Sequence, residues 1–312
     1  MTDFFTGTIV ISMLTATMRI ATPLLLAALG ELVVERAGVL NLGLEGMMLL
    51  ACFAAFIVTL VSGSQAAGLA AAVAAGLVIA ALFGFMTITL RTEQFVTGLA
   101  INLLASGLTL YAFRAYQIVS GKESPTITLL PNLALPLLAD LPGLGEIFFQ
   151  HNLLTYLAFG LTPLLWAFLY RTRYGLELRF AGENPATLDT RGLSVAWRRY
   201  LAVLFGGAMA GLAGAFISLG SSVRFVPEMT AGRGWLAIVI VIAGNWLPQR
   251  VLLAALVFAF MNAFQLQAQA LGLNLPYQLL LALPYAVAVL AMMLGRANSR
   301  APTALGIPYQ RP

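Results

Sequence analysis

Glu45 has the most unusual setting of any carboxylate in this sequence. It lies in ERAGVLNLGLEGMM (35–48), which runs directly into the apolar LLACFAAFIVTLV, and a charged group in such surroundings is costly. A carboxylate placed there could act as a general acid or base, carry a proton, cap a helix or contact a solute. It shares a helix face with Asn41, four residues earlier. The rest of the sequence helps to choose between these roles.

The groups that would accompany a catalytic carboxylate are missing from the sequence. His151 is the only histidine and Cys52 the only cysteine, and they lack the spacing of metal ligands or of a Cys–His nucleophile. Neither GxxxxGK[ST] nor GxSxG occurs, and the only lysine, Lys122, sits in GKESP, in a segment we expect to be a loop. We therefore predict that the chain is not an enzyme and binds no metal or cofactor. Cys52 is expected to be a packing residue, and His151 an interfacial one.

The composition is that of a membrane protein. Of 312 residues, 60% are hydrophobic and only 9% are charged, whereas soluble domains carry about 25% charged residues. The windows 46–90 and 251–295 hold no charged residue. As a single helix each would be about 67 Å long, against a hydrocarbon core of about 30 Å, so each must contain two helices. The basic excess is explained by membrane topology, and we expect neither nucleic acid binding nor a removable signal peptide.

Apolar runs between turns and charges predict a single transmembrane domain, 1–312, with an all-α, polytopic helix bundle. We predict nine spans, at residues 8–30, 38–61, 66–90, 95–119, 150–170, 200–223, 234–248, 251–270 and 276–295. The first span is the weakest, because Arg19 falls near its middle and arginine there costs about 2.5–3.5 kcal/mol. In the alternative, residues 4–18 lie along the outer interface and 20–37 make the first crossing.

Charge asymmetry predicts the orientation. The segment 171–199 carries six arginines, and the C-terminal tail adds Arg296, Arg300 and Arg311, so both are expected in the cytoplasm. Four predicted spans separate them, and an even number of crossings places both on the same side of the membrane. Counting back places the loop 120–149 and the N-terminus outside.

Small residues recur every fourth position in the third predicted span. These residues are Gly68, Ala72, Gly76, Ala80 and Gly84. A second set occurs in GGAMAGLAGA (206–215). Helices in lipid associate through close backbone contact over small residues, so we expect both sets to lie in tight helix contacts, within the bundle or at a dimer face.

Several polar side chains fall at membrane depth and should not face lipid. They are Asn41, Glu45, Asn102, Asn262, Gln265, Gln267 and Gln269. They either hydrogen-bond between helices or line a solute path, and a path lined by neutral groups would suit a polar, uncharged solute. Gly38, Gly43 and Gly46 weaken a continuous helix, and broken helices at this depth must be buried or line a cavity. We therefore expect the second span to be discontinuous.

The predicted cytoplasmic segment contains signals for a short helix. Asn184 can cap the free amides and Pro185 fits the first turn, while Gly192 provides a stop. This helix is either a docking element for a partner or an ordinary surface helix.

The sequence resembles the permease subunits of ABC importers of the branched-chain amino acid, ribose and nucleoside type, most of all the nucleoside and simple-sugar branch. The resemblance covers most of the chain, and ERAGVLNLGLEGMM is specific to this branch. The matching segments are TPLLLAALGELVVERAGVLNLGLEGMMLL (22–50), VTGLAINLLASGL (96–108), GLELRFAGENPATLDTRGLSV (175–195), RGWLAIVIVIAGNW (233–246) and LQAQALGLNLPYQLLLALPYAVAVL (266–290).

The resemblance implies that two such permeases pair, usually as a heterodimer, in the bacterial cytoplasmic (inner) membrane. Two copies of a cytoplasmic ABC ATPase would bind ATP and magnesium, and an extracytoplasmic lipoprotein would deliver the solute. A cytoplasmic coupling helix would rest on the ATPase. The matching positions are Glu183, Asn184, Pro185, Ala186, Thr187, Asp189, Thr190, Arg191 and Gly192. The family commonly has a second alanine where Thr187-Leu188 stand, which puts only fine contacts in doubt.

The leading functional hypothesis is half of a pore for nucleosides or related purine and pyrimidine compounds. The alternatives are a monosaccharide or a branched-chain amino acid as solute, then an ion-coupled secondary transporter using Glu45, and last a membrane enzyme or passive channel. Glu45 itself is expected to cap a half-helix, to bond a neighbouring helix or to touch the solute. Glu35 and Arg36 are expected at the cytoplasmic side, where exposure or pairing is cheap.

Overall fold

The computed structural model describes residues 7–121, 125–134, 136, 138–270, 278, 282, 286–287, 289–290, 293 and 300–310. Its helices are α1 (Gly7–Arg36), α2 (Leu44–Ser62), α3 (Gln65–Gly84), α4 (Gln94–Ser120), α5 (Leu144–Phe148), α6 (Leu153–Arg171), α7 (Arg173–Glu183), α8 (Pro185–Thr190), α9 (Val195–Ala215), α10 (Arg233–Ala243) and α11 (Pro248–Ala270). Helices α3 and α9 continue into the π-helical turns η2 (Phe85–Thr89) and η3 (Phe216–Gly220). Strands β1 (Asn132–Ala134) and β2 (Gln150–Asn152) pair antiparallel.

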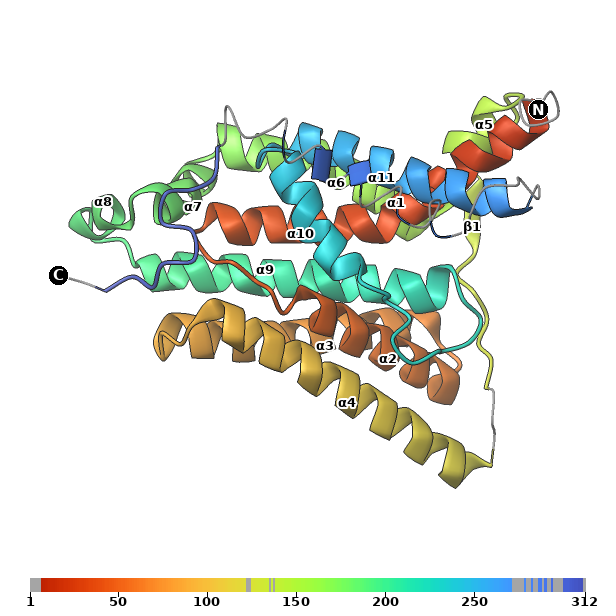
Figure 1. The fold of residues 1–312 in the computed structure, drawn as a ribbon, viewed down its shortest axis with the longest axis horizontal. Helices are drawn as coiled ribbons and strands as arrows, with labels where there is room; N and C mark the ends of the chain where they lie inside the picture. Colours follow the sequence, from red (N-terminus) through yellow and green to blue (C-terminus); the bar gives the residue numbers. More distant parts are fainter. Residues whose placement is uncertain are drawn as a thin grey trace.

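The long helices form one bundle, with α9 between α1 on one side and α2 and α3 on the other (Figure 1). Seven helical segments among the described residues are long and apolar enough to cross a membrane. The all-α, polytopic prediction is confirmed. The segment 171–199 forms α7, α8 and the start of α9, and β1 and α5 lie in the loop 120–149.

Side chains at the helix starts explain where most of these helices begin. Thr172, Asn184 and Ser194 each accept a hydrogen bond from a backbone amide in the first turn of α7, α8 and α9. Ser64, Glu93 and Asn152 do the same for α3, α4 and α6. Such caps satisfy amides that have no partner inside the helix. Helices α2, α5 and α10 begin after a glycine without such a cap.

Small residues let the backbones of α3 and α9 approach closely. A Cβ atom added to Gly76 would lie 2.1 Å from the carbonyl oxygen of Gly207, and one added to Gly211 would lie 2.7 Å from that of Ala72. The two small-residue sets predicted from the sequence therefore pack against each other inside this chain.

Three of the predicted spans need correction or lie outside the described residues. Helix α1 is continuous to Arg36, so the first span does not stop at residue 30, and residues 7–18 and 20–36 are not separate segments. The span predicted at 234–248 is helical for only 11 residues, about 17 Å, which is too short to cross alone. Of the span 276–295, only isolated positions are described. Arg296 and Arg311 of the tail, and Lys122 of the loop, also lie outside the described residues.

The two ends of the bundle carry different elements. At one end, here named the α8 end, α7 and α8 lie beside the end of α1 and the segment 300–310 (Figure 1). At the other, the α5 end, the start of α1 contacts α5, with Thr15 hydrogen-bonded to the Glu146 carbonyl. The N-terminal part of α1 and the described C-terminal segment therefore lie at opposite ends of the bundle.

Candidate functional site

An irregular segment, residues 37–43, separates α1 from α2. It turns back from the end of α1 and runs beside the bundle before α2 begins (Figure 1). Its backbone amides are bound by side chains of two helices. The Leu40 amide donates to Oε1 of Gln94 at 2.7 Å, and the Asn41 amide donates to Oε1 of Glu31 at 2.9 Å. The expected interruption of the second span is thus located before its helix, where the freed backbone groups are satisfied by protein.

Asn102 of α4 holds the junction between this segment and α2. Its Nδ2 donates to the carbonyl oxygen of Leu42 at 2.8 Å, and its Oδ1 accepts from the amide of Gly46 at 2.8 Å. Within the segment, Oδ1 of Asn41 accepts from the amide of Gly43 at 3.1 Å. Both asparagine side chains therefore form hydrogen bonds with backbone groups of the irregular segment 37–43 or of the first turn of α2.

The carboxylate of Glu45 caps α10, a helix almost two hundred residues further along the chain. Its Oε1 accepts from the amide of Gly232 at 2.9 Å and its Oε2 from the amide of Gly234 at 2.6 Å. Because Glu45 is also in the first turn of α2, its negative charge lies at the positive ends of two helices. A Cβ on Gly234 would lie 2.6 Å from Cα of Glu45, so glycine is needed for this approach. Capping and interhelical bonding, two of the roles expected for Glu45, are what the structure shows.

The residues predicted to line a solute path fall into two groups in the structure. Asn41, Glu45 and Asn102 meet where α2, α4 and α10 converge. Three further residues, Asn262, Gln265 and Gln269, lie on α11, and no hydrogen bond among the described residues joins them to the first group. On α11, Asn262 donates to the Phe258 carbonyl at 3.0 Å, Gln265 is buried and Gln269 is exposed.

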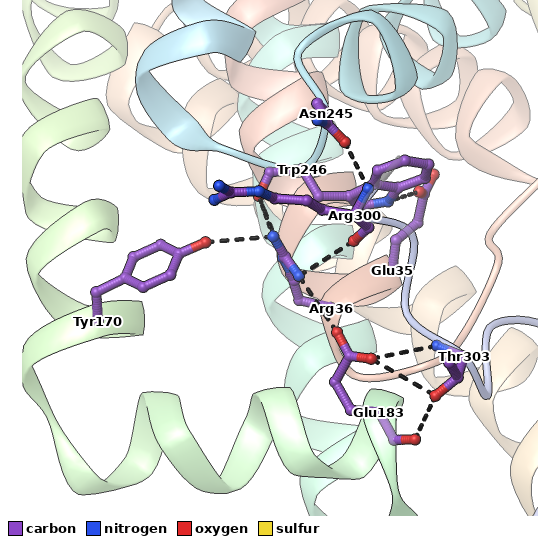
Figure 2. Close-up of polar contacts among 8 residues, drawn as sticks. All are labelled: Glu35, Arg36, Tyr170, Glu183, Asn245, Trp246, Arg300 and Thr303. Carbon is purple, nitrogen blue, oxygen red and sulfur yellow. Dashed lines mark hydrogen bonds and ion pairs between the residues drawn. The ribbon is translucent and has the colours of Figure 1, made fainter. Parts of the chain in front are cut away.

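Arg36, the last residue of α1, is buried where four other parts of the chain meet (Figure 2). Its Nε and Nη2 donate to the carbonyl oxygen of Trp246, at 3.1 and 2.8 Å. Nη1 donates to the carbonyl of Arg300 at 3.4 Å, and Nη2 to the hydroxyl of Tyr170 at 3.2 Å. Nη1 also lies 3.6 Å from Oε1 of Glu183, the last residue of α7. Arg36 thus joins α1, α6, α7, the turn after α10 and the C-terminal segment.

Glu35 completes this cluster from the neighbouring position. Its carboxylate is fully buried and accepts a hydrogen bond from the indole Nε1 of Trp246. Of the two roles expected for Glu35 and Arg36, exposure or pairing, exposure is wrong, because the turn after α10 and the segment 300–310 cover both residues. Pairing is what the structure shows, with Arg36 beside Glu183. Buried charges persist only when they are paired or hydrogen-bonded. Arg36 has several partners, whereas Glu35 is bonded through Oε2 alone, and its Oε1 is buried with no hydrogen-bond partner among the described residues.

The short helix predicted from GENPATLDTRGLS is confirmed as α8. Oδ1 of Asn184 accepts from the amide of Thr187 at 3.3 Å, and Pro185 occupies the first turn. Gly192 follows the helix with φ of 74°, a backbone conformation that glycine adopts without strain. Leu188 is buried in a small apolar cluster with α7 and α9. Helix α7, which precedes α8, was not predicted.

The segment 300–310 binds the α8 end mainly through its backbone. The amide of Ala304 donates to the carbonyl of Gly182 at 2.8 Å, and the amide of Gly306 to that of Gly38 at 3.2 Å. These bonds place the segment between α7 and the irregular segment 37–43. This contact could not be predicted from the sequence, because hydrogen bonds between main-chain groups do not depend on residue type.

Two side chains of this segment reach the α8 region directly. The Tyr309 hydroxyl donates to Oδ2 of Asp189 in α8 at 3.2 Å. Thr303 donates from its hydroxyl to the carbonyl oxygen of Glu183. Helix α8 is therefore connected through Glu183 to both Arg36 and the C-terminal segment.

The remaining reactive side chains have ordinary surroundings. Cys52 is buried, and His151 is also buried, with Nε2 2.8 Å from the Ile147 carbonyl oxygen. His151 lies in β2, just before α6 begins, and its expected position at the membrane interface stays a prediction. In the part of the chain that the structure describes, no three His, Cys, Asp or Glu side chains are grouped as metal ligands.

Comparison with known proteins identifies the family to which the chain belongs. Residues 13–294 match the family described as branched-chain amino acid transport system / permease component. The chain is 44% identical to a putative glucose ABC transporter permease, TsgC13 of Haloferax volcanii, over 84% of this chain and 79% of that protein.

Two further relatives match almost over their full length. The guanosine ABC transporter permease NupQ of Bacillus subtilis is 35% identical, over 94% of this chain and 95% of that protein. The nucleoside ABC transporter permease NupC of Lactococcus lactis is 32% identical over 93% of both. No solved structure matches. With the family match covering most of its length, the chain belongs to the branched-chain amino acid transport system / permease component family, as a multi-pass, non-catalytic ABC transporter permease subunit.

Proposed function

We propose that this permease forms half of a pore that imports nucleosides or related purine and pyrimidine compounds. The observation that carries the proposal is the near full-length similarity to a guanosine permease and a nucleoside permease. In both matches the aligned region includes the break at 37–43 and helices α8 and α10.

The surroundings of Glu45 support an uncharged solute. Both oxygens of its carboxylate accept hydrogen bonds from backbone amides. Charges held in this way are already compensated by protein, which favours a polar, neutral cargo over an ion. On α11, Asn262, Gln265 and Gln269 stay our candidates for hydrogen bonding to that cargo.

A monosaccharide is the second candidate. It is favoured by the 44% identity to the putative glucose permease, although that match covers less of both chains. Nucleosides and glucose share neutral, hydroxyl-rich sugar rings, so one pore architecture suits either. An extracytoplasmic binding protein would make most of the distinction.

The proposed assembly has the α8 end in the cytoplasm. The arginine-rich segment 171–199 and Arg300 lie at that end, which supports this orientation through the positive-inside rule. Helix α8 would then rest on a cytoplasmic ABC ATPase that binds ATP and magnesium, through Glu183 to Gly192. A second permease, completing a heterodimer, and a binding lipoprotein would complete an importer in the bacterial cytoplasmic membrane.

Uptake in a deletion strain tests the solute. In a strain lacking paralogues, deletion of this gene should abolish uptake of radiolabelled guanosine, and a plasmid copy should restore it. Labelled glucose, measured in the same cells, is the matched comparison. Unchanged guanosine uptake would contradict the proposal, and loss of glucose uptake alone would establish the second candidate.

A further inference from the structure

Helix α10 is tied to the rest of the protein at both ends by polar contacts. At its start, Gly232 and Gly234 donate to the carboxylate of Glu45. At its end, the chain turns through residues 244–247, where Trp246 binds both Glu35 and Arg36. With only 11 residues, α10 is short enough to move as one rigid piece when either end is displaced.

Arg36 is bound more strongly to the turn after α10 than to the side chain of Glu183. Two donors of Arg36 converge on the Trp246 carbonyl in a buried site, and charge-assisted bonds of this kind are strong. Its contact with Glu183 is an ion pair of 3.6 Å to a side chain that is 44% exposed, and exposed ion pairs contribute little. The ion pair with Glu183 therefore holds α7 to Arg36 only weakly. A shift of α7 and α8 reaches Arg36 mainly through backbone packing, because Gly182 of α7 lies so close to the carbonyl oxygen of Arg36 that a Cβ there would clash with it, and Arg36 moves together with the turn after α10.

The guanidinium suits this position better than any other cationic group. Arginine presents five donors in a rigid plane, and Arg36 uses them on Trp246, Tyr170 and Arg300 at once (Figure 2). A lysine ammonium would carry the charge but would not hold several partners in one fixed geometry.

We propose that Arg36 and Glu35 are positioning residues that couple α8 to α10, so that displacement of α7 and α8 moves the start of α10 at Glu45. This inference rests on the proposed function, since it assigns α8 to an ATPase contact. It adds residues outside the matched coupling segment, and it names α10 as the membrane helix that responds. The route runs from Gly182 and Glu183 at the end of α7 to Arg36 and the neighbouring Glu35, and from these two residues through Trp246 to α10.

The test uses the complete complex of both permeases, the ATPase and the binding protein in proteoliposomes. Trp246→Phe removes the indole donor to Glu35 and keeps the carbonyl that binds Arg36. This variant therefore tests the Glu35 contact alone, and we expect solute uptake to fall while the ATPase rate stays within twofold of wild type. Trp235→Phe is the matched control, because Trp235 lies on α10 and is 39% exposed, and it should leave both rates unchanged.

Arg36→Lys and Arg36→Gln extend the test, with Lys expected to keep assembly and ATPase activity but not coupled uptake. A proportional fall of uptake and ATPase rate, or wild-type values for both, in Arg36→Lys would overturn the inference for Arg36, and the same result in Trp246→Phe would overturn it for Glu35.

Spin labels measure the movement directly and separate the two proposals. With Cys52 replaced by alanine, labels at Leu103 of α4 and Ile242 of α10, both exposed, should change their separation after ATP and vanadate trapping. The change should be absent in Arg36→Lys, which loses the fixed bonds to the Trp246 carbonyl. A change of equal size in Arg36→Lys would overturn the coupling route alone. If the wild-type complex shows neither ATP-dependent uptake nor a distance change, the proposed function fails and the coupling route with it.

Discussion

The two short helices α8 and α10 begin in different ways. Helix α8 carries its own cap, Asn184, which is adjacent to the amides it serves. Helix α10 begins after Gly232, which has no side chain, and receives its cap from Glu45 on α2. The start of α2 is also served from elsewhere, by Asn102 on α4.

The difference follows from where each helix begins. A surface helix can leave its first amides to water or to a local side chain, and α8 does so. Helix α10 begins against α2, with Gly232 half-buried and Gly234 buried, and free amides that are covered by protein need a partner from the protein. A cap supplied from another helix also ties the positions of the two helices together. We therefore expect substitutions at the start of α10 to affect more of the protein than those at the start of α8.

Removal of the Glu45 carboxylate should have the largest effect. Glu45→Ala leaves two amides without their acceptor, at Gly232 and Gly234, and each such loss costs about 1–3 kcal/mol. We expect a marked loss of thermal stability in detergent and at least tenfold less uptake. Glu228→Ala is the matched control, because Glu228 is an exposed carboxylate in the segment leading into α10. Equal stability of the two variants would show that the cap is dispensable.

A methyl group at the α2–α10 contact should have an intermediate effect. Gly234→Ala places Cβ 2.6 Å from Cα of Glu45, and overpacking of this kind costs about 1–3 kcal/mol. We expect uptake to fall several-fold, with a smaller loss of thermal stability than in Glu45→Ala. Gly160→Ala is the control, since nothing lies within 4 Å of a Cβ at this position of α6. A Gly234→Ala variant with wild-type uptake would mean that the two helix starts are not held together.

The fold could be predicted largely from local pattern. Apolar runs located the long helices, and the Asn184, Pro185 and Gly192 signals located α8, because each depends on neighbours in the chain. The seventh predicted span failed for a physical reason. The run at 234–248 is apolar enough to span, but the helix ends at Ala243, and Asn245 and Trp246 adopt positive φ in the turn that contacts Glu35 and Arg36.

The site was predictable in part. Residue type and depth singled out Asn41, Glu45 and Asn102, because polar groups in lipid need partners. Their partners are mostly backbone atoms far away in the sequence, which residue types do not reveal. The burial of Glu35 and Arg36 was missed for the same reason, since it depends on the segment 300–310 folding back over them.

The local cap of α8 should give the smallest effect. Asn184→Ala removes the acceptor of the Thr187 amide, a change that costs about 1 kcal/mol, and α8 has water available for the freed group. We expect thermal stability close to wild type and a two- to threefold loss of ATP-driven uptake. Asn184→Ser should restore uptake, because serine is also a good cap. If serine is as damaging as alanine, Asn184 acts through a contact other than capping. The contrast between a local cap on α8 and a distant cap on α10 would then be wrong. If serine restores uptake, the two helix starts differ as their surroundings require, with a replaceable cap at the surface and a fixed one inside the bundle.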